Sequence, residues 1–480
     1  MMRYPFTHNM ADQRPILHRL DAKWAPNRLA HLAVVMASLA FSSAGQAVDF
    51  GPFFAHGFIK GEVSQGNNRC YDCQWLPNEG KDKYWADELN PGKPFGVKNA
   101  DNTLAGLWVG AKYDIGGGYK FNALLNNRWR NNNQELPGFY YEANVGVSHE
   151  EYGAISYGAM TTRNWAWADL YGGNLGFSYA WGSSGAGYGV VKNALRVTTR
   201  ALDLFEGDVV LEATYDPGNT QFKIHKPRFL ELWATYRKGD LVVDLTAQDT
   251  RNGKPLAFGQ ALFYEPVRDA AWDNRIGGSG QSTLQILARY QVDTKLEVSG
   301  GVRRNRWSGA LATWTVTPIA PNIPVNGKVC LTYLEYINCP GTGGEWNDAF
   351  NVDWSTPNFT SGLPAGFFLR GYPVTSNDFM LGARYRMGSW LSKAGLMYLG
   401  RGKTANPSER GQSNTLTVAS LGLEYDFGNG FNAYGSLNSA RYGRIGLSPI
   451  SSPSNSAFTD VDSRIARGGV WVVTGVEYVF

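Results

Sequence analysis

The chain ends in Val476-Glu477-Tyr478-Val479-Phe480, where apolar and polar residues alternate around a tyrosine. Alternation of this kind indicates β-strands with one apolar face. An outward tyrosine just before a tight turn is typical of strands that end at the water interface of a membrane. The same apolar-polar-tyrosine phrase occurs five times earlier, and in four of those copies a glycine lies three residues after the tyrosine: Ala111-Lys112-Tyr113, Ala234-Thr235-Tyr236, Ala288-Arg289-Tyr290, Ala383-Arg384-Tyr385 and Leu423-Glu424-Tyr425.

The composition favours one large architecture that is not a helical membrane protein. Aromatic residues make up 14% of the 480 residues and glycine is frequent, at 57, yet the mean hydropathy is −0.31. Half of the residues of a membrane barrel face water, which accounts for so polar an average. No linker or low-complexity stretch divides the chain. The net charge of +4 is too small to favour a nucleic-acid partner.

Residues 1–47 have the pattern of a secretory signal peptide. Basic residues precede an apolar run over 29–41, and small residues up to Ala47 follow as a cleavage site. Met10 is a second candidate start, because the basic region is unusually long. A membrane anchor is the alternative, but the apolar run is shorter than the roughly 20 residues that a spanning helix needs.

Sixteen runs of the remaining chain alternate with period two, and the turns between them are short after every even-numbered run. Longer loops follow the odd-numbered runs, and the longest covers 307–375. Residues 48–480 are therefore predicted to form an all-β, transmembrane, antiparallel up-and-down β-barrel of 16 strands, with short periplasmic turns and long extracellular loops. A soluble sandwich or propeller would also alternate, but its loops are rarely so long. The predicted strands are 53–65, 103–115, 119–131, 139–149, 153–162, 193–202, 208–216, 228–238, 241–249, 281–292, 294–306, 376–387, 390–402, 415–427, 430–442 and 468–480.

The cysteines fall in two close pairs, Cys70 with Cys73 and Cys330 with Cys339. In an exported protein these pairs predict two local disulfides, and their spacing fits a zinc site poorly. None of the histidines outside the signal region has a neighbouring serine or cysteine in a nucleophile motif. We therefore expect no catalytic site, no metal and no cofactor.

Three stretches resemble the general porin family of the Gram-negative outer membrane, which is sixteen-stranded and trimeric. They are 107–121, with its triple-glycine turn, 141–147 and 152–158. The resemblance implies an outer-membrane location, a homotrimer, contact with lipid and lipopolysaccharide, and insertion by the barrel-assembly machinery, with Tyr478 and Phe480 as the insertion signal. It further implies passive diffusion of small hydrophilic solutes. The chain departs from the family at 54–58, at 158–160 and in its third loop, which contains a single carboxylate.

Taking Tyr478 and Phe480 as lipid-facing assigns one face of every strand to the lumen. The family resemblance implies that the third loop, 163–192, folds inward and narrows the pore opposite a basic wall. The expected loop residues are Trp165, Trp167, Asp169 and Tyr171, and the expected wall residues are Lys60, Arg128, Arg130, Glu142, Arg196 and Arg200. Few acids on the loop predict a weak to moderate anion preference.

Three other interpretations stay open. The wall arginines could simply form ion pairs with Glu142 or Glu212. The aromatic loop could bind a sugar, an organic acid or an aromatic solute, which would make the protein a substrate-specific channel. A barrel used for adhesion would fit the long loop over 307–375 but has no motif in its favour.

Overall fold

The computed structural model describes residues 48–70, 99–130, 133–134, 141–166, 168–177, 181, 185–218, 228–251, 262–263, 279–309, 324–325, 328–329, 374–404, 415–443 and 467–480. All of them belong to one compact unit, Gly45–Phe480. The predicted signal peptide, 1–47, and almost all of the 307–375 loop lie outside the described residues.

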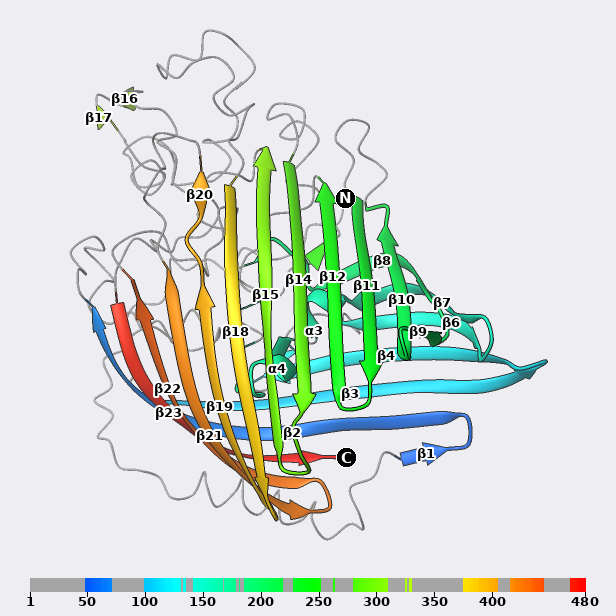
Figure 1. The fold of residues 1–480 in the computed structure, drawn as a ribbon, viewed down its shortest axis with the longest axis horizontal. Helices are drawn as coiled ribbons and strands as arrows, with labels where there is room; N and C mark the ends of the chain where they lie inside the picture. Colours follow the sequence, from blue (N-terminus) through cyan, green and yellow to red (C-terminus); the bar gives the residue numbers. More distant parts are fainter. Residues whose placement is uncertain are drawn as a thin grey trace. The chain divides into compact units, whose positions relative to one another are not determined.

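Sixteen long strands stand in this part of the chain, and each corresponds to one predicted run (Figure 1). They are β2 Phe53–Cys70, β3 Asn99–Gly116, β4 Tyr119–Arg130, β6 Glu142–His149, β7 Gly153–Thr161, β8 Val190–Thr198, β10 Gly207–Asp216, β11 Arg228–Lys238, β12 Leu241–Arg251, β14 Ser279–Gln291, β15 Leu296–Gly309, β18 Val374–Met387, β19 Trp390–Leu399, β21 Leu416–Gly428, β22 Phe431–Tyr442 and β23 Arg467–Val479. Several strands run a few residues past the predicted bounds, most of all β2 and β3.

Shorter elements complete the described structure. The two helices are α3 Arg163–Ala166 and α4 Ala168–Tyr171, and the short strands are β1 Val48–Phe50, β5 Asn133–Gln134, β9 Leu202–Leu204, β13 Leu262–Phe263, β16 Pro324–Val325, β17 Lys328–Val329 and β20 Lys403–Thr404. Within the described residues, neither helix is long and apolar enough to span a membrane.

The sixteen strands close into a barrel. Each long strand pairs antiparallel with the next one in the chain, from β2 and β3 through to β22 and β23. The last strand then returns to the first, because β23 pairs with β2 from Val479 opposite Phe58 to Arg467 opposite Cys70. The predicted sixteen-strand up-and-down barrel is therefore confirmed.

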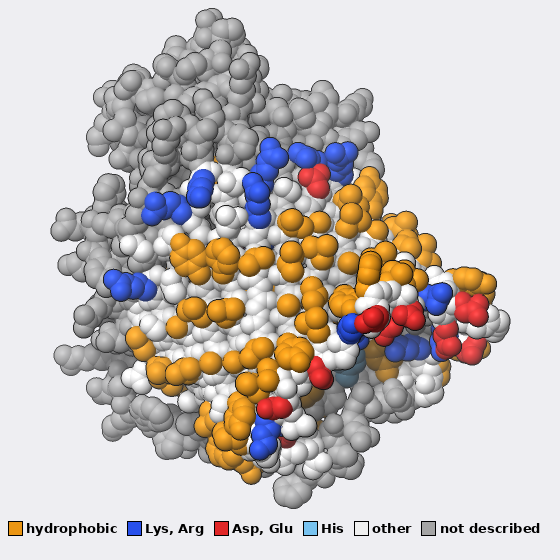
Figure 2. Space-filling view, viewed as in Figure 1, with side chains coloured by type: hydrophobic (Ala, Val, Ile, Leu, Met, Phe, Trp, Pro, Cys, Tyr) orange, Lys and Arg blue, Asp and Glu red, His pale blue; other side chains and the backbone are white. Residues whose placement is uncertain are grey.

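Alternation along each strand separates an apolar outer face from a polar inner face. On β11, Leu230 and Leu232 are exposed on the outside, whereas Glu231 and Thr235 are buried on the inside. Successive side chains of a strand point to opposite faces, so apolar residues recur at the outward positions of this strand and polar residues recur at its inward positions. Figure 2 shows the result as bands of apolar side chains across the outer surface.

The short turns all lie at one end of the barrel, here called the short-turn end. The turn between β3 and β4 has Gly116, Gly117 and Gly118 at φ of +89°, +62° and +82°. Three consecutive residues with positive φ are tolerated only where side chains are absent, which explains this glycine run. The repeated tyrosines lie beside these turns on the outer face, and Tyr425 packs edge to face on Trp390 at 4.7 Å.

Candidate functional site

The chain turns inward directly after β7. The Nε and Nη2 atoms of Arg163 donate hydrogen bonds to Glu212 on β10, at 2.8 and 2.7 Å. The backbone N–H groups of Arg163 and Asn164 donate to Glu231 on β11, at 2.9 and 3.2 Å. Two carboxylates on the inner wall thus hold the start of this inward segment, which we define as residues 162–189 where they are described.

The middle of the inward segment crosses several more strands. The Tyr171 hydroxyl donates to Asp244 on β12, and Ser299 Oγ on β15 donates to the Tyr171 carbonyl at 3.0 Å. Burial, and next the Asp244 carboxylate, raise the pKa of the Tyr171 phenol well above its ordinary value, so the phenol remains a donor.

A glycine contact lets the inward segment approach the wall closely. Gly172 and Gly173 lie on Gly382 of β18 and Gly395 of β19, which face each other in the ladder. A Cβ added to Gly382 would lie 2.8 Å from the carbonyl carbon of Gly172. The wall at this point must therefore be glycine.

The returning part of the segment is fixed by Trp181. Its Nε1 donates to Gln285 on β14 at 2.7 Å, and the guanidinium of Arg303 on β15 lies 4.2 Å from the centre of its ring. Arg303 also donates to the Trp181 carbonyl and pairs with Asp378 on β18 at 2.6 Å. Arg303 and Asp378 are both almost completely buried.

An apolar cluster packs the inward segment against this wall. It joins side chains of the segment to inward residues of β14, β18, β19, β21 and β22: Tyr171, Phe177, Trp181, Leu287, Met380, Met397, Leu399, Leu416, Val418 and Ala440. The contacts of the segment itself extend from Glu212 on β10 to Gly422 on β21, the cluster continues to β22, and this half of the inner face is not uniformly polar.

Two predicted wall residues, Glu142 and Arg196, meet beside the start of the segment. Glu142 accepts hydrogen bonds from the Thr161 N–H at 3.1 Å and hydroxyl at 2.6 Å. Arg196 Nη2 donates to the Thr161 carbonyl at 2.7 Å, and its Nε lies 3.1 Å from Glu212. The geometry thus matches the ion-pair interpretation for Arg196.

The opposite wall, β2 to β4, carries two more predicted residues. Lys60 Nζ pairs with Glu62 at 3.0 Å, and the Tyr434 hydroxyl donates to Glu62 at 2.8 Å. The Arg128 guanidinium lies over two rings, at 5.9 Å from the centre of Trp108 and 5.1 Å from that of Tyr141.

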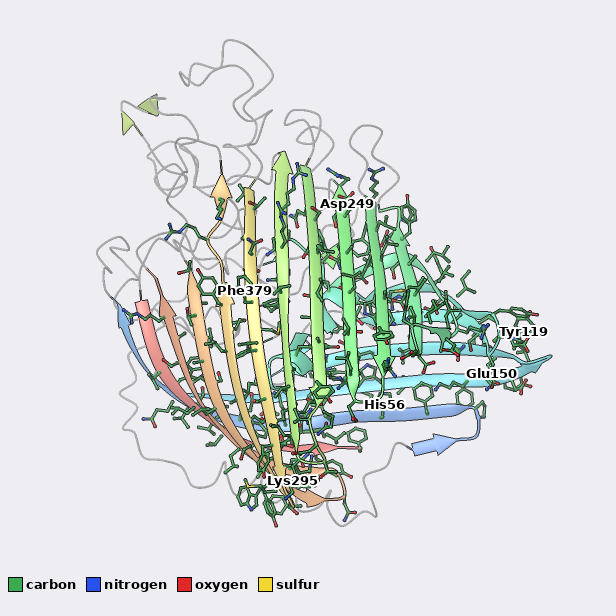
Figure 3. All side chains as sticks on the ribbon, viewed as in Figure 1. His56, Tyr119, Glu150, Asp249, Lys295 and Phe379 are labelled. Atoms are coloured by element: carbon green, nitrogen blue, oxygen red, sulfur yellow. The ribbon has the colours of Figure 1, made fainter. Side chains whose placement is uncertain are left out.

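Inward aromatic residues continue from Trp108 along the same wall. His56 on β2 is directly opposite Trp108 on β3, and their rings stack at 5.5 Å with an interplanar angle of 6°. Phe54 stacks on His56 at 5.8 Å, and Lys112 Nζ lies 5.5 Å from the Phe54 ring centre. Figure 3 shows His56 on the β2 side of the barrel. This stack is the main feature that the sequence analysis did not predict. Strand alternation alone already places these residues on the inner face, so the signal was present in the sequence.

The structure does not bring every predicted residue to these groups. Arg200 is exposed beyond the end of β8, at the short-turn end next to Gly153. The side chains of Arg130, Trp165, Asp169 and Cys70 lie outside the described residues, as do Trp167, Cys73, Cys330 and Cys339 entirely.

The chain end is built into the barrel seam. The N–H of Phe480 donates to the carbonyl of Gly57 at 2.9 Å, and the N–H of Gly57 donates back at 2.7 Å. The rings of Tyr478 and Phe480 stack at 5.9 Å.

Basic side chains lie along the border of the apolar outer face, at the end of the barrel opposite the short turns. Arg228, Arg251, Arg304 and Arg306 are exposed near the outer ends of β11, β12 and β15, and Figure 2 shows basic side chains above the apolar bands. In Figure 3, Asp249 marks the end with these basic side chains and Lys295 marks the short-turn end.

Among the described residues, no group of three His, Cys, Asp or Glu side chains is arranged to hold a metal ion.

No family model and no curated protein sequence matches the chain. Similar solved structures include OmpT, an outer membrane protein of Vibrio cholerae, with a TM-score of 0.48 and 11% identity over 91% of this chain and 100% of that chain. The outer membrane channel DcaP of Acinetobacter baumannii has a TM-score of 0.48 and 10% identity over the same shares. A mutant of the Rh. blastica porin has a TM-score of 0.41 and 11% identity over 89% of this chain and 100% of that chain. The fold assignment rests on the strand pairing described above.

Proposed function

We propose that the protein forms a water-filled, porin-like channel for passive diffusion of small hydrophilic solutes and ions across a Gram-negative outer membrane. The observation that carries this proposal is the division of side chains between the two faces of the closed sheet. Leu230 and Leu232 lie outside, while Glu231, Asp244 and Lys393 lie inside. A basic residue facing lipid would cost about 2 to 4 kcal/mol at the membrane midplane, so this pattern fits lipid outside and water inside.

We further propose that the passage is narrowest between the inward segment and the wall of β2 to β4. The contacts of the segment over β10 to β21 support this placement, because they leave the segment facing the opposite strands. We attribute the proposed weak to moderate anion preference to the basic side chains of this wall, where Arg128 and Lys112 lie beside aromatic rings. Lys60 and Arg196 contribute less net field, since they pair with Glu62 and Glu212.

Planar-bilayer recording on the purified protein tests both statements. Conductance steps are expected, and their absence would remove the channel proposal. In a salt gradient, the reversal potential should show anion preference, and Arg128→Ala should move it toward cations. Arg304→Ala removes an exposed arginine of the outer face and should leave the reversal potential unchanged.

A homotrimer in contact with lipopolysaccharide belongs to the same proposal. Small residues hollow the apolar outer face over β18 to β21, where Ala383, Ala394 and Ala419 lie between leucines. Such a surface accepts the side chains of a neighbouring copy, and the exposed arginines above the apolar bands suit lipid phosphates. Chemical cross-linking of the protein in native membranes should give trimers, and a purely monomeric pattern would count against this part.

A second candidate function is a channel selective for particular solutes. The stacked rings on β2 and β3 favour it, since general diffusion does not need them. Saturable block of the ion current by one solute would distinguish the two candidates.

A further inference from the structure

We infer that the stack on β2, β3 and β4 is a binding site for small aromatic carboxylates on their way through the channel. The stack consists of Lys112, Phe54, His56, Trp108, Arg128 and Tyr141 in spatial order. This inference rests on the proposed channel function and adds a solute class to it.

The stack is a built feature of the inner wall. Residues 54 and 56 share the inner face of β2 by alternation, and the register places Trp108 beside His56. Arg128 lies opposite Gly106, which leaves room for the neighbouring rings. A Cβ on Gly106 would lie 2.5 Å from the Phe58 ring and 3.0 Å from the Trp108 ring.

The orientation of the rings selects the class of ligand. Phe54, His56 and Trp108 are nearly parallel, with successive ring centres 5.8 and 5.5 Å apart, so an offset stack of this kind presents ring edges along its side. Ring edges carry the positive part of the aromatic quadrupole and attract the π-face of another ring. Sugars stack on open ring faces, whereas the two end rings of this stack, Phe54 and Trp108, have Lys112 and Arg128 over their faces.

The charges select an anion. Lys112 lies at one end of the three rings and Arg128 at the other. A guanidinium binds a carboxylate with two parallel hydrogen bonds, and a planar acid can reach it while its ring lies on the ring edges.

The binding should be weak, because a transported solute must also leave. One charge-assisted hydrogen-bonded contact with one ring contact corresponds to half-saturation at about 1 to 10 mM. A site of this strength would raise the local concentration of the solute without trapping it.

Ion-current recording on the full chain in planar bilayers tests the inference with four probes. Benzoate should reduce the current saturably, whereas cyclohexanecarboxylate, benzyl alcohol and glucose should do so at least about fivefold less effectively. Trp108→Leu and Arg128→Gln should each raise the half-saturating benzoate concentration about fivefold or more. Trp390→Leu removes a tryptophan of the outer face and should leave it unchanged.

The outcomes separate this inference from the channel proposal. Conductance steps in each variant show that the barrel has formed, so a misfolded variant is recognised and Phe54→Leu replaces it. Steps without benzoate block, or equal block by cyclohexanecarboxylate, would overturn the inference and leave the channel intact. Stronger block by glucose would overturn it in favour of a sugar site.

Discussion

The buried pair of Arg303 and Asp378 should hold two neighbouring strands and the inward segment together, and Arg303→Leu tests this. The two side chains are 0% and 1% exposed, and Nη2 of Arg303 lies 2.6 Å from Asp378. Arg303 also covers the Trp181 ring and donates to the Trp181 carbonyl. Removing one partner leaves the other charge buried and unpaired, so we expect the free energy of unfolding to fall by about 3 to 5 kcal/mol.

A second substitution distinguishes the cost of leaving a buried charge unpaired from the cost of the lost contacts. Asp378 also accepts hydrogen bonds from Asn305 at 2.7 Å and from the Gly400 N–H at 2.9 Å, each contributing about 1 kcal/mol. Asp378→Leu alone should therefore cost at least as much as Arg303→Leu. The double variant leaves no unpaired buried charge. Its cost should therefore be smaller than the sum of the two single costs by about 2 kcal/mol or more.

Guanidinium titration of the detergent-solubilised barrel, followed by far-UV circular dichroism, measures these differences. The exposed pair of Arg251 and Asp249, at 45% and 39% exposure, is the matched control. Its double leucine variant should change stability by less than about 1 kcal/mol. Additive costs in the Arg303 and Asp378 cycle would refute the buried-pair reasoning.

Three further perturbations test other parts of the structure. Gly382→Val should push the inward segment into the lumen and lower the single-channel conductance, whereas Gly435→Val, whose Cβ has room, should not. Leu421→Arg places a charge at a 61% exposed outer position and should cost about 2 to 4 kcal/mol in denaturant titrations, and an unchanged stability would mean that this face does not meet lipid. Asp293 accepts the N–H groups of Lys295 and Leu296 at 2.7 and 2.8 Å, which holds the pKa of this turn carboxyl below its ordinary value. Its contribution is present above the ordinary pKa and lost as pH falls through the lower folded value, so Asp293→Asn should flatten the acid end of the stability profile.

The barrel was predictable because its information is local. On β11, Leu230 and Glu231 alternate as a closed sheet with two different surroundings requires, and the glycine turns divide one strand from the next. The short-turn end follows from the same pattern. The observed strands differ from the predicted ones only at their ends, because β2 and β3 continue to pair beyond their alternating residues.

The interior was harder to predict because its contacts join distant parts of the chain. Tyr171 and Asp244 are 73 residues apart, and no spacing rule links them. Arg200 has the parity of a lumen residue, but β8 ends at Thr198 and leaves it exposed. His56 and Trp108 needed only one more step, because strand parity combined with the register between neighbouring strands puts their rings together.

The inner face divides into two halves with different tasks. The half from β10 to β21 holds the inward segment, and its Arg163 and Arg303 are paired with Glu212 and Asp378. Charges paired in this way fix the segment and add little net field. The stack on β2 to β4 contains Lys112 and Arg128 beside aromatic rings, so ion selectivity and solute binding should depend on the same side chains. Arg128 substitutions that change the reversal potential should therefore also weaken benzoate block, and a variant that separates the two effects would locate the selectivity elsewhere.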